Sequence, residues 1–196
     1  MPDVQVLLLV AGAYALGSLS TGYYLVKLRT GQDVRLLGSG STGARNVGRA
    51  LGAPAFVATL AGDTAKGIIA VGVAVIAGVG DWGLMLVAIA VSAGHVWPVQ
   101  LRFRGGKGLA TVMGAVLVLD YWIVILALLV AAIAFAISKH FTPSGLVAVA
   151  LVPALTAMTG RSSIEVVIGL SALAALVLIA HRRNILSALE KPEHRR

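Results

Sequence analysis

The sequence contains no cysteine, which excludes disulfide bonds, thiolate metal sites and cysteine nucleophiles. Charge is scarce as well, because Asp, Glu, Lys and Arg make up only 12% of the 196 residues, whereas soluble domains have about 25%. The acidic side is the poorer one, with 8 residues against 16 basic ones, and the formal net charge is +8. In an apolar chain, basic cytoplasmic loops and anionic lipids or ligands explain this excess better than nucleic acid does. We therefore expect no nucleic-acid partner.

Long apolar runs take the place of the missing charge. Hydrophobic residues make up 58% of the chain and the mean hydropathy is +0.92, so we predict an integral membrane protein. The first run, Val4–Val26, is too long for a cleaved signal peptide and lacks its basic start and small-residue cleavage site. The expected fold is one all-α polytopic domain over residues 1–196. Its predicted spans are Val4–Val26, Ala53–Gly80, Leu84–Leu101, Leu109–Leu119, Tyr121–Ile137, Ser144–Gly160 and Ile164–Ala180.

This interpretation predicts about seven transmembrane helices. The fourth, Leu109–Leu119, is too short to cross directly and reads as a half-helix or short span with its N-terminus open to a site. If the short segments re-enter on one side, the number falls to five. With the N-terminus outside, all Lys and Arg residues except Lys66 and Arg161 lie on one side. By the positive-inside rule we expect an outside N-terminus and a cytoplasmic C-terminus.

Three polar segments then lie on the cytoplasmic side, at residues 38–49, 94–111 and 181–184. The first, a basic loop within 27–49, mixes four glycines with small polar side chains and two arginines, a composition typical of backbone anion sites. A helical run resumes near Ala50, and a helix N-terminus there would strengthen such a site. Taken singly, each segment also fits a basic loop or a cationic helix end. Together they suit phosphate, and the membrane setting suits a lipid phosphate precursor.

Neither glycine-rich segment is a P-loop. The first lacks the Lys-Ser/Thr ending, and the second has Gly108 after Gly106-Lys107 where Ser or Thr is required. ATP hydrolysis of the P-loop type is therefore not expected.

One span carries two opposite charges. Asp63 and Lys66 are three residues apart on one helix face, and each uncompensated charge at this depth costs roughly 2.5–3.5 kcal/mol. They must face protein or water, and a structural ion pair and a functional role are both open. Such charges also occur in small anion transporters, a second hypothesis, although the two halves show no inverted repeat. A lipid-binding scaffold is a third.

Five motifs follow one another along the chain. They are Tyr14-x-x-Gly17-Ser18, Gly31-x-Asp33-x-Arg35 with Gly38–Arg49, Asp63-x-x-Lys66-Gly67, Gly94-His95-x-x-Pro98 with Phe103–Thr111, and His181-Arg-x-Asn184-Ile185. In this order and spacing, over nearly the whole length, the sequence resembles the bacterial acyl-phosphate:glycerol-3-phosphate acyltransferases of the PlsY type. It departs from their pattern at Ser20, where proline is usual, at Ser41, where asparagine is usual, and at Arg45, where a small polar residue is common.

The resemblance implies transfer of a fatty acyl group from acyl phosphate to the 1-hydroxyl of glycerol 3-phosphate, giving lysophosphatidic acid and phosphate. This is the first acylation step of phospholipid synthesis. It further implies a monomeric, multi-pass enzyme of the bacterial plasma membrane with its active site facing the cytoplasm, and no metal or cofactor. Its implied catalytic residues are Asn184, His181 and Lys107. Its substrate- or phosphate-binding residues are Ser39, Arg49, Gly38, Gly40, Arg45, Asn46, Gly105, Gly106 and Gly108. Residues with a structural or supporting role are Asp63, Lys66, His95 and Thr142.

Side-chain chemistry limits the roles that these residues can take. Asn184 is no strong base, but it can orient a hydroxyl or donate to a developing oxyanion. His181 fits a base or an orienting hydrogen-bonding group, and both remain open. Because the leaving phosphate can itself accept the hydroxyl proton, we favour positioning with substrate-assisted proton transfer. The His-x-x-x-x-Asp motif of another acyltransferase class is absent, since Gln100, Gly145 and Leu186 follow His95, His140 and His181 at that spacing.

Overall fold

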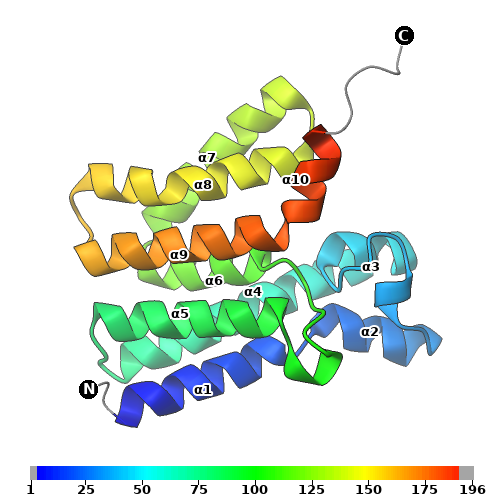
Figure 1. The fold of residues 1–196 in the computed structure, drawn as a ribbon, viewed down its shortest axis with the longest axis horizontal. Helices are drawn as coiled ribbons and strands as arrows, with labels where there is room; N and C mark the ends of the chain where they lie inside the picture. The colour runs from blue at the N-terminus through cyan, green and yellow to red at the C-terminus, as the bar shows by residue number, and fades with distance from the viewer. Residues whose placement is uncertain (1–3, 190–196) are drawn as a thin grey trace.

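The computed structural model describes residues 4–189, which form helices joined by turns and loops (Figure 1). Helices α1, α5, α9 and α8 pack side by side in that order, α4 packs on α6, and α7 packs on α8. Helices α2, α3 and α10 gather at one end of this bundle with the loop that joins α5 to α6, and we call this end the polar end. The elements are α1 (Val4–Ser18), α2 (Thr21–Thr30), η1 (Val34–Leu36), α3 (Ala44–Leu51), α4 (Ala53–Ile76), α5 (Asp81–Val96), η2 (Val99–Leu101), α6 (Leu109–Leu119), α7 (Tyr121–Ser138), α8 (Phe141–Thr159), α9 (Ile164–Ala180) and α10 (Arg182–Leu189).

Five stretches of the described residues are long and apolar enough to cross a membrane, which confirms the predicted all-helical membrane fold. Helices α6 and α9 are apolar but shorter, and both begin and end at the predicted residues. Seven spans and the orientation of the two termini remain predictions. Three of the basic residues in the predicted cytoplasmic tail, Lys191, Arg195 and Arg196, lie outside the described residues. The five stretches are Val4–Thr30, Ala53–Ile76, Asp81–Leu101, Tyr121–Ser138 and Phe141–Thr159.

The first span is broken, whereas the sequence predicts one helix over 4–26. Helix α1 ends at Ser18 and α2 begins at Thr21, with Ser20 in an extended conformation (φ −84°, ψ 95°). The break leaves backbone carbonyls without helical partners, and the Lys66 ammonium of α4 donates to the Gly17 carbonyl at 3.0 Å and the Leu19 carbonyl at 3.2 Å. Hydropathy carries no information about such a distant partner.

The segment 27–49 is largely helical, so its prediction as a loop is wrong. Helix α2 continues to Thr30 and ends at Gly31, whose left-handed conformation (φ 72°) directs its N–H to the Lys27 carbonyl. Helix α3 begins at Ala44 rather than near Ala50, because Asn46 and Val47 give it a buried face. The predicted order of glycine loop followed by helix N-terminus is nevertheless found, six residues earlier than expected.

Glycines allow the helices that carry the polar end to approach closely. A Cβ at Gly17 of α1 would fall on the Val91 carbonyl of α5, and one at Gly94 of α5 would fall on the Tyr14 carbonyl of α1. The same contact occurs between α4 and α6, where Gly67 meets the backbone of Thr111. Backbones in such contact fix one helix firmly against the next, as is usual in membranes. The C-terminal end of α5 is therefore held in place where the loop to α6 departs.

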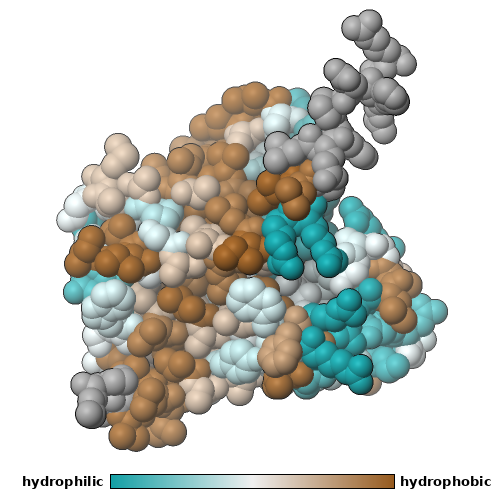
Figure 2. All heavy atoms as spheres, in the orientation of Figure 1, coloured by the Kyte–Doolittle hydropathy of each residue, from teal (hydrophilic) through white to brown (hydrophobic). Residues whose placement is uncertain are grey.

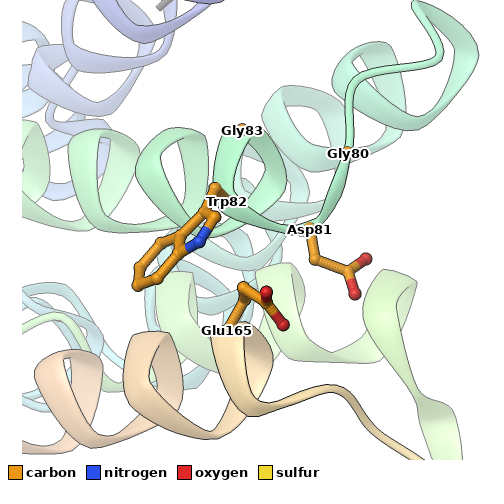
Figure 3. Close-up of a pocket in the computed structure, with 5 residues that line it drawn as sticks. All are labelled: Gly80, Asp81, Trp82, Gly83 and Glu165. Atoms are coloured by element: carbon orange, nitrogen blue, oxygen red, sulfur yellow. The ribbon is translucent and has the colours of Figure 1, made fainter.

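On the face shown in Figure 2, hydrophobic surface covers most of the bundle and hydrophilic surface is concentrated at the polar end. The opposite end of the bundle carries acidic side chains. There Asp81 and Glu165 flank a shallow hollow beside Trp82 (Figure 3), and a second hollow is lined by Asp81, Asp120 and Arg161. The predicted placement of Arg161 away from the other basic residues is thereby confirmed.

Candidate active site

The loop before α3 is shaped by the buried side chain of Asn46. Its Nδ2 donates to the carbonyls of Val34 (3.1 Å), Leu37 (2.9 Å) and Ser41 (2.9 Å), and its Oδ1 accepts from the Ser39 N–H (2.9 Å). The polar atoms of this side chain are thus used within the protein, so Asn46 holds the loop rather than reaching outward. It was predicted from the motif as a binding residue.

Two glycines let this loop turn back over Asn46. Gly38 (φ 51°) and Gly40 (φ 70°) both lie in the left-handed region, and a Cβ at Gly38 would collide with the Asn46 Oδ1. Ser39 lies between them and is exposed at the polar end. The loop therefore presents Ser39 on a backbone that only glycine neighbours allow.

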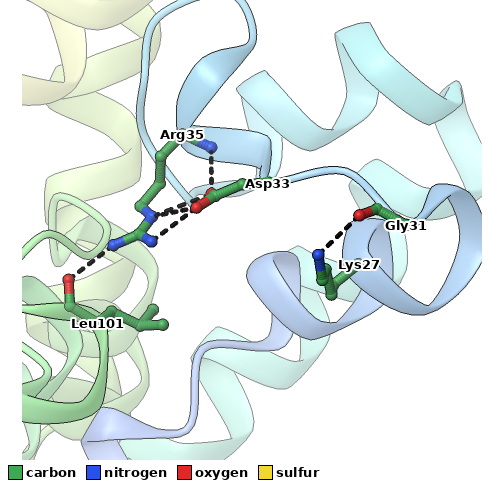
Figure 4. Close-up of polar contacts among 5 residues, drawn as sticks. All are labelled: Lys27, Gly31, Asp33, Arg35 and Leu101. Atoms are coloured by element: carbon green, nitrogen blue, oxygen red, sulfur yellow. Dashed lines mark hydrogen bonds and ion pairs between the residues drawn. The ribbon is translucent and has the colours of Figure 1, made fainter.

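Arg35, just before the first polar segment, connects this part of the chain to the second segment (Figure 4). The Asp33 carboxylate accepts hydrogen bonds from the Arg35 backbone and guanidinium, with Nη2 to Oδ2 at 2.6 Å, and the Arg35 Nη1 donates to the Leu101 carbonyl at 2.6 Å. The bond from Arg35 lowers the pKa of Asp33, which keeps the carboxylate charged. A second link runs from the Thr42 N–H to the Gly105 carbonyl at 3.5 Å.

In the second segment, two predicted phosphate-binding glycines are engaged internally. The Gly105 N–H donates to the Val96 carbonyl (3.1 Å) and the Gly106 N–H to the His95 carbonyl (3.0 Å), both at the end of α5. These two amides are therefore not available to an anion, and the motif gave no sign of this. Gly108 (φ 84°) is the N-cap of α6 and packs against Val96 and the α9 side chains.

Lys107 and Asn184 meet, although they are 77 residues apart in sequence. The Lys107 ammonium donates to the Asn184 Oδ1 at 2.6 Å, which joins the second and third polar segments. Burial, together with the nearby Arg45 and Arg49, lowers the pKa of Lys107. The three predicted segments thus converge on one place, where three cationic side chains come near one another.

His181 lies beside this contact, at the end of α9. It is buried, and its Nδ1 is 2.8 Å from the Val177 carbonyl. A carbonyl can only accept, so Nδ1 carries the hydrogen and Nε2 is the acceptor in the neutral ring. Burial lowers the pKa of His181, the bond to Val177 opposes this, and Lys107 adds to the lowering. The neutral ring is therefore favoured at neutral pH.

Arg45 connects α3 to the start of α8. Its guanidinium donates to the Thr142 Oγ1 and lies 5.2 Å from the centroid of the Phe141 ring. Arg49, in the last turn of the same helix, is exposed. Thr142 thus lies next to the site. Phe141 also contacts Arg45, although it is in none of the quoted motifs.

A buried charged group lies behind the site. Lys66 Nζ is 3.1 Å from the Asp63 Oδ1, and His95 Nδ1 is 3.5 Å from the same oxygen. The predicted face-sharing of Asp63 and Lys66 is confirmed, and the partner that sequence spacing did not reveal is His95. Among residues 4–189, no three His, Asp or Glu side chains form a group that would hold a metal ion.

Comparison with known proteins identifies the family. The family model described as "Glycerol-3-phosphate acyltransferase" matches residues 7–191. The chain belongs to the glycerol-3-phosphate acyltransferase family. The motif resemblance is thereby confirmed at the level of the whole chain.

Individual members of this family are similar to the chain in sequence and in structure. The chain is 45% identical to glycerol-3-phosphate acyltransferase 1 of Desulfitobacterium hafniense over 97% of its length and 94% of the relative's. It is 40% identical to the Synechococcus enzyme over 96% of its length and 94% of that protein. Crystal structures of PlsY, an integral membrane glycerol 3-phosphate acyltransferase, superpose on 98% and 97% of the chain and cover 96% and 95% of PlsY. Their glycerol 3-phosphate and lysophosphatidic acid forms give TM-scores of 0.89 and 0.86 at 34% and 32% identity.

Three connections escaped prediction in this glycerol-3-phosphate acyltransferase. Arg35 and Asp33 stood in a quoted motif but were not expected to join two segments. The Tyr14 hydroxyl donates to the Trp97 carbonyl at 2.7 Å, and the Gln100 side chain donates to the Ser18 carbonyl. Both tie the loop after α5 to α1; Tyr14 and Ser18 stand in a quoted motif, but the motif did not indicate these partners.

Proposed function

We propose that this acyltransferase moves a fatty acyl group from acyl phosphate to the 1-hydroxyl of glycerol 3-phosphate, releasing lysophosphatidic acid and inorganic phosphate. The observation that carries the proposal is the contact between Lys107 and Asn184, two residues from distant segments, beside Arg45 and Arg49. The related PlsY was crystallised in glycerol 3-phosphate and lysophosphatidic acid forms, which supports the acceptor and the product.

Both proposed substrates carry phosphate, so the site must neutralise two anions placed close together. We assign this task to Lys107, Arg49 and Arg45, helped by the exposed Ser39 hydroxyl. Burial lowers the pKa of Lys107, and repulsion from Arg45 and Arg49 lowers it further before substrate binds. A phosphate between them relieves that repulsion, which favours binding of an anion.

The reaction needs an oriented hydroxyl and a stabilised oxyanion more than it needs a strong base. The Asn184 Oδ1 accepts the hydrogen bond from Lys107, and an amide N–H of the same side chain is the kind of donor that stabilises a developing oxyanion. The neutral His181 offers Nε2 as an acceptor that can orient the hydroxyl. In our proposal the hydroxyl oxygen attacks the acyl carbon, the bond from that carbon to the phosphate oxygen breaks, and the leaving phosphate takes the hydroxyl proton.

The acyl-phosphate donor is supported by the motif pattern and by the charge of the site. No histidine is followed at the right spacing by the aspartate of the His-x-x-x-x-Asp acyltransferases. A donor that brings its own good leaving group and proton acceptor suits a site without such a pair. We further propose a monomer in the bacterial plasma membrane whose polar end faces the cytoplasm, where glycerol 3-phosphate is dissolved.

The test uses the purified full-length protein in detergent with palmitoyl phosphate and radiolabelled glycerol 3-phosphate. We expect labelled lysophosphatidic acid and free phosphate in equal amounts. Lys107→Ala and Asn184→Ala should abolish turnover while the protein still folds. Product from palmitoyl-CoA but not from palmitoyl phosphate would refute acyl phosphate as the donor. Near-normal rates in either variant would refute the assignment of the site.

A further inference from the structure

Three titratable side chains lie buried where the proposed mechanism does not use them. Asp63 and Lys66 of α4 and His95 of α5 are only 2–4% exposed. Both Lys66 and His95 approach the same carboxylate oxygen of Asp63, at 3.1 and 3.5 Å. A buried charge is costly unless it is paired, so each member of this group needs a reason to be there.

The reasons for Lys66 and Asp63 are visible in the fold. Lys66 donates to two carbonyls that the break between α1 and α2 leaves open, and Asp63 balances its charge. Neither of these contacts requires His95, since Lys66 already pairs with Asp63.

His95 has a second contact, with the loop that carries Lys107. A Cβ at Gly106 would overlap the His95 ring at Nε2 and Cε1, so the ring lies directly against the Gly106 backbone. The Gly106 N–H also donates to the His95 carbonyl at 3.0 Å. The imidazole is therefore placed between Asp63 on one side and the residue before Lys107 on the other.

We propose that His95, oriented by Asp63, is a positioning residue that fixes the Gly106 backbone and so holds the Lys107 ammonium at Asn184. The inference rests on the proposed function, because it assumes that Lys107 acts on the reacting phosphate. Its path runs from Asp63 Oδ1 through the imidazole and Gly106 to the 2.6 Å contact at Asn184. In an oriented reaction, a displacement of about 1 Å costs on the order of 100-fold in rate.

Two substitutions separate the two sides of the ring. Asn at position 95 places its amide near the place of Nδ1 and keeps the contact with Asp63, but leaves the Gly106 side empty. Gln reaches the place of Nε2 and keeps the Gly106 side. We expect His95→Asn to lower kcat roughly 10- to 100-fold, with the KM for glycerol 3-phosphate changed less than about threefold, and His95→Gln to recover most of the loss.

Ser92→Ala is the matched control. Ser92 lies three residues before His95 on α5, is buried, and its hydroxyl makes no hydrogen bond. This variant should keep the wild-type kcat. Melting temperatures in detergent, measured for every variant, separate loss of folded protein from loss of turnover.

The outcomes are distinct. If the wild-type protein catalyses no acyl transfer, the proposed function itself is refuted. Active wild type together with a normal kcat in His95→Asn, or with His95→Asn more active than His95→Gln, overturns the positioning role alone. If His95→Asn does not fold, Gly106→Ala tests the same contact from the other side. A kcat lowered by at least about tenfold in folded Gly106→Ala supports the proposal, and an unchanged kcat refutes it.

Discussion

Replacing Asn184 by aspartate changes the charge of the site with almost no change of shape. The Lys107 ammonium already lies 2.6 Å from the Asn184 Oδ1, so the new carboxylate would form an ion pair without rearrangement. We therefore expect Asn184→Asp to fold, with a melting temperature above that of Asn184→Ala. Its activity should nevertheless be lost, because the substrate phosphate needs the same ammonium.

The size of the loss follows from the geometry. If one ammonium donates to both a phosphate oxygen and the carboxylate, the two negative oxygens are about 5 Å apart. At an effective dielectric constant of about 20, their repulsion is roughly 3 kcal/mol, which corresponds to about two orders of magnitude in rate.

The assay is the initial rate of phosphate release from palmitoyl phosphate with glycerol 3-phosphate, alongside the melting temperature in detergent. Asn184→Ala is the control, because it removes the amide without adding charge and should melt below the aspartate variant. An Asn184→Asp enzyme with a near wild-type rate, or one that melts below Asn184→Ala, would refute the reasoning.

The remaining predictions concern charge and the glycine loop. The charged form of Lys107 must hold phosphate, and its pKa is lowered. The alkaline fall of kcat/KM should therefore occur at a pH below the ordinary lysine pKa of about 10.4. Arg45→Ala removes a neighbouring cation, so this alkaline limb should move to higher pH; a limb that stays in place would contradict the shared charge. Asn46→Ala leaves loop carbonyls and the Ser39 N–H unpaired and should destabilise the protein by about 1–3 kcal/mol, measured by thermal unfolding in detergent. Arg49→Lys should lower kcat/KM about tenfold or more if the guanidinium binds phosphate through two N–H groups, and unchanged kinetics would exclude that geometry.

Much of the architecture could be predicted from local sequence. Helices α6 and α9 begin and end where expected, because their apolar runs are closed by glycine, aspartate, serine or histidine. The convergence of the three polar segments was also predictable, since loop charge places all of them on one side of the membrane. The contact between Lys107 and Asn184 agrees with that expectation.

The features that escaped prediction depend on partners far away in the chain. The break after Ser18 is stabilised by Lys66, and the Gly105 and Gly106 amides are occupied by the end of α5. A glycine-rich segment looks the same in sequence whether its N–H groups face a ligand or a helix end. Asn46 illustrates the same limit, because only the folded loop shows that its amide is already used.

The interrupted first span has an evolutionary corollary. A kink made by proline depends on one residue. This kink instead depends on Lys66 of the neighbouring helix α4 and on Asp63, which balances the charge of Lys66. Losing either one alone would leave an unbalanced charge buried inside the helix bundle. Among relatives, positions 63 and 66 should therefore be inherited or discarded as a pair.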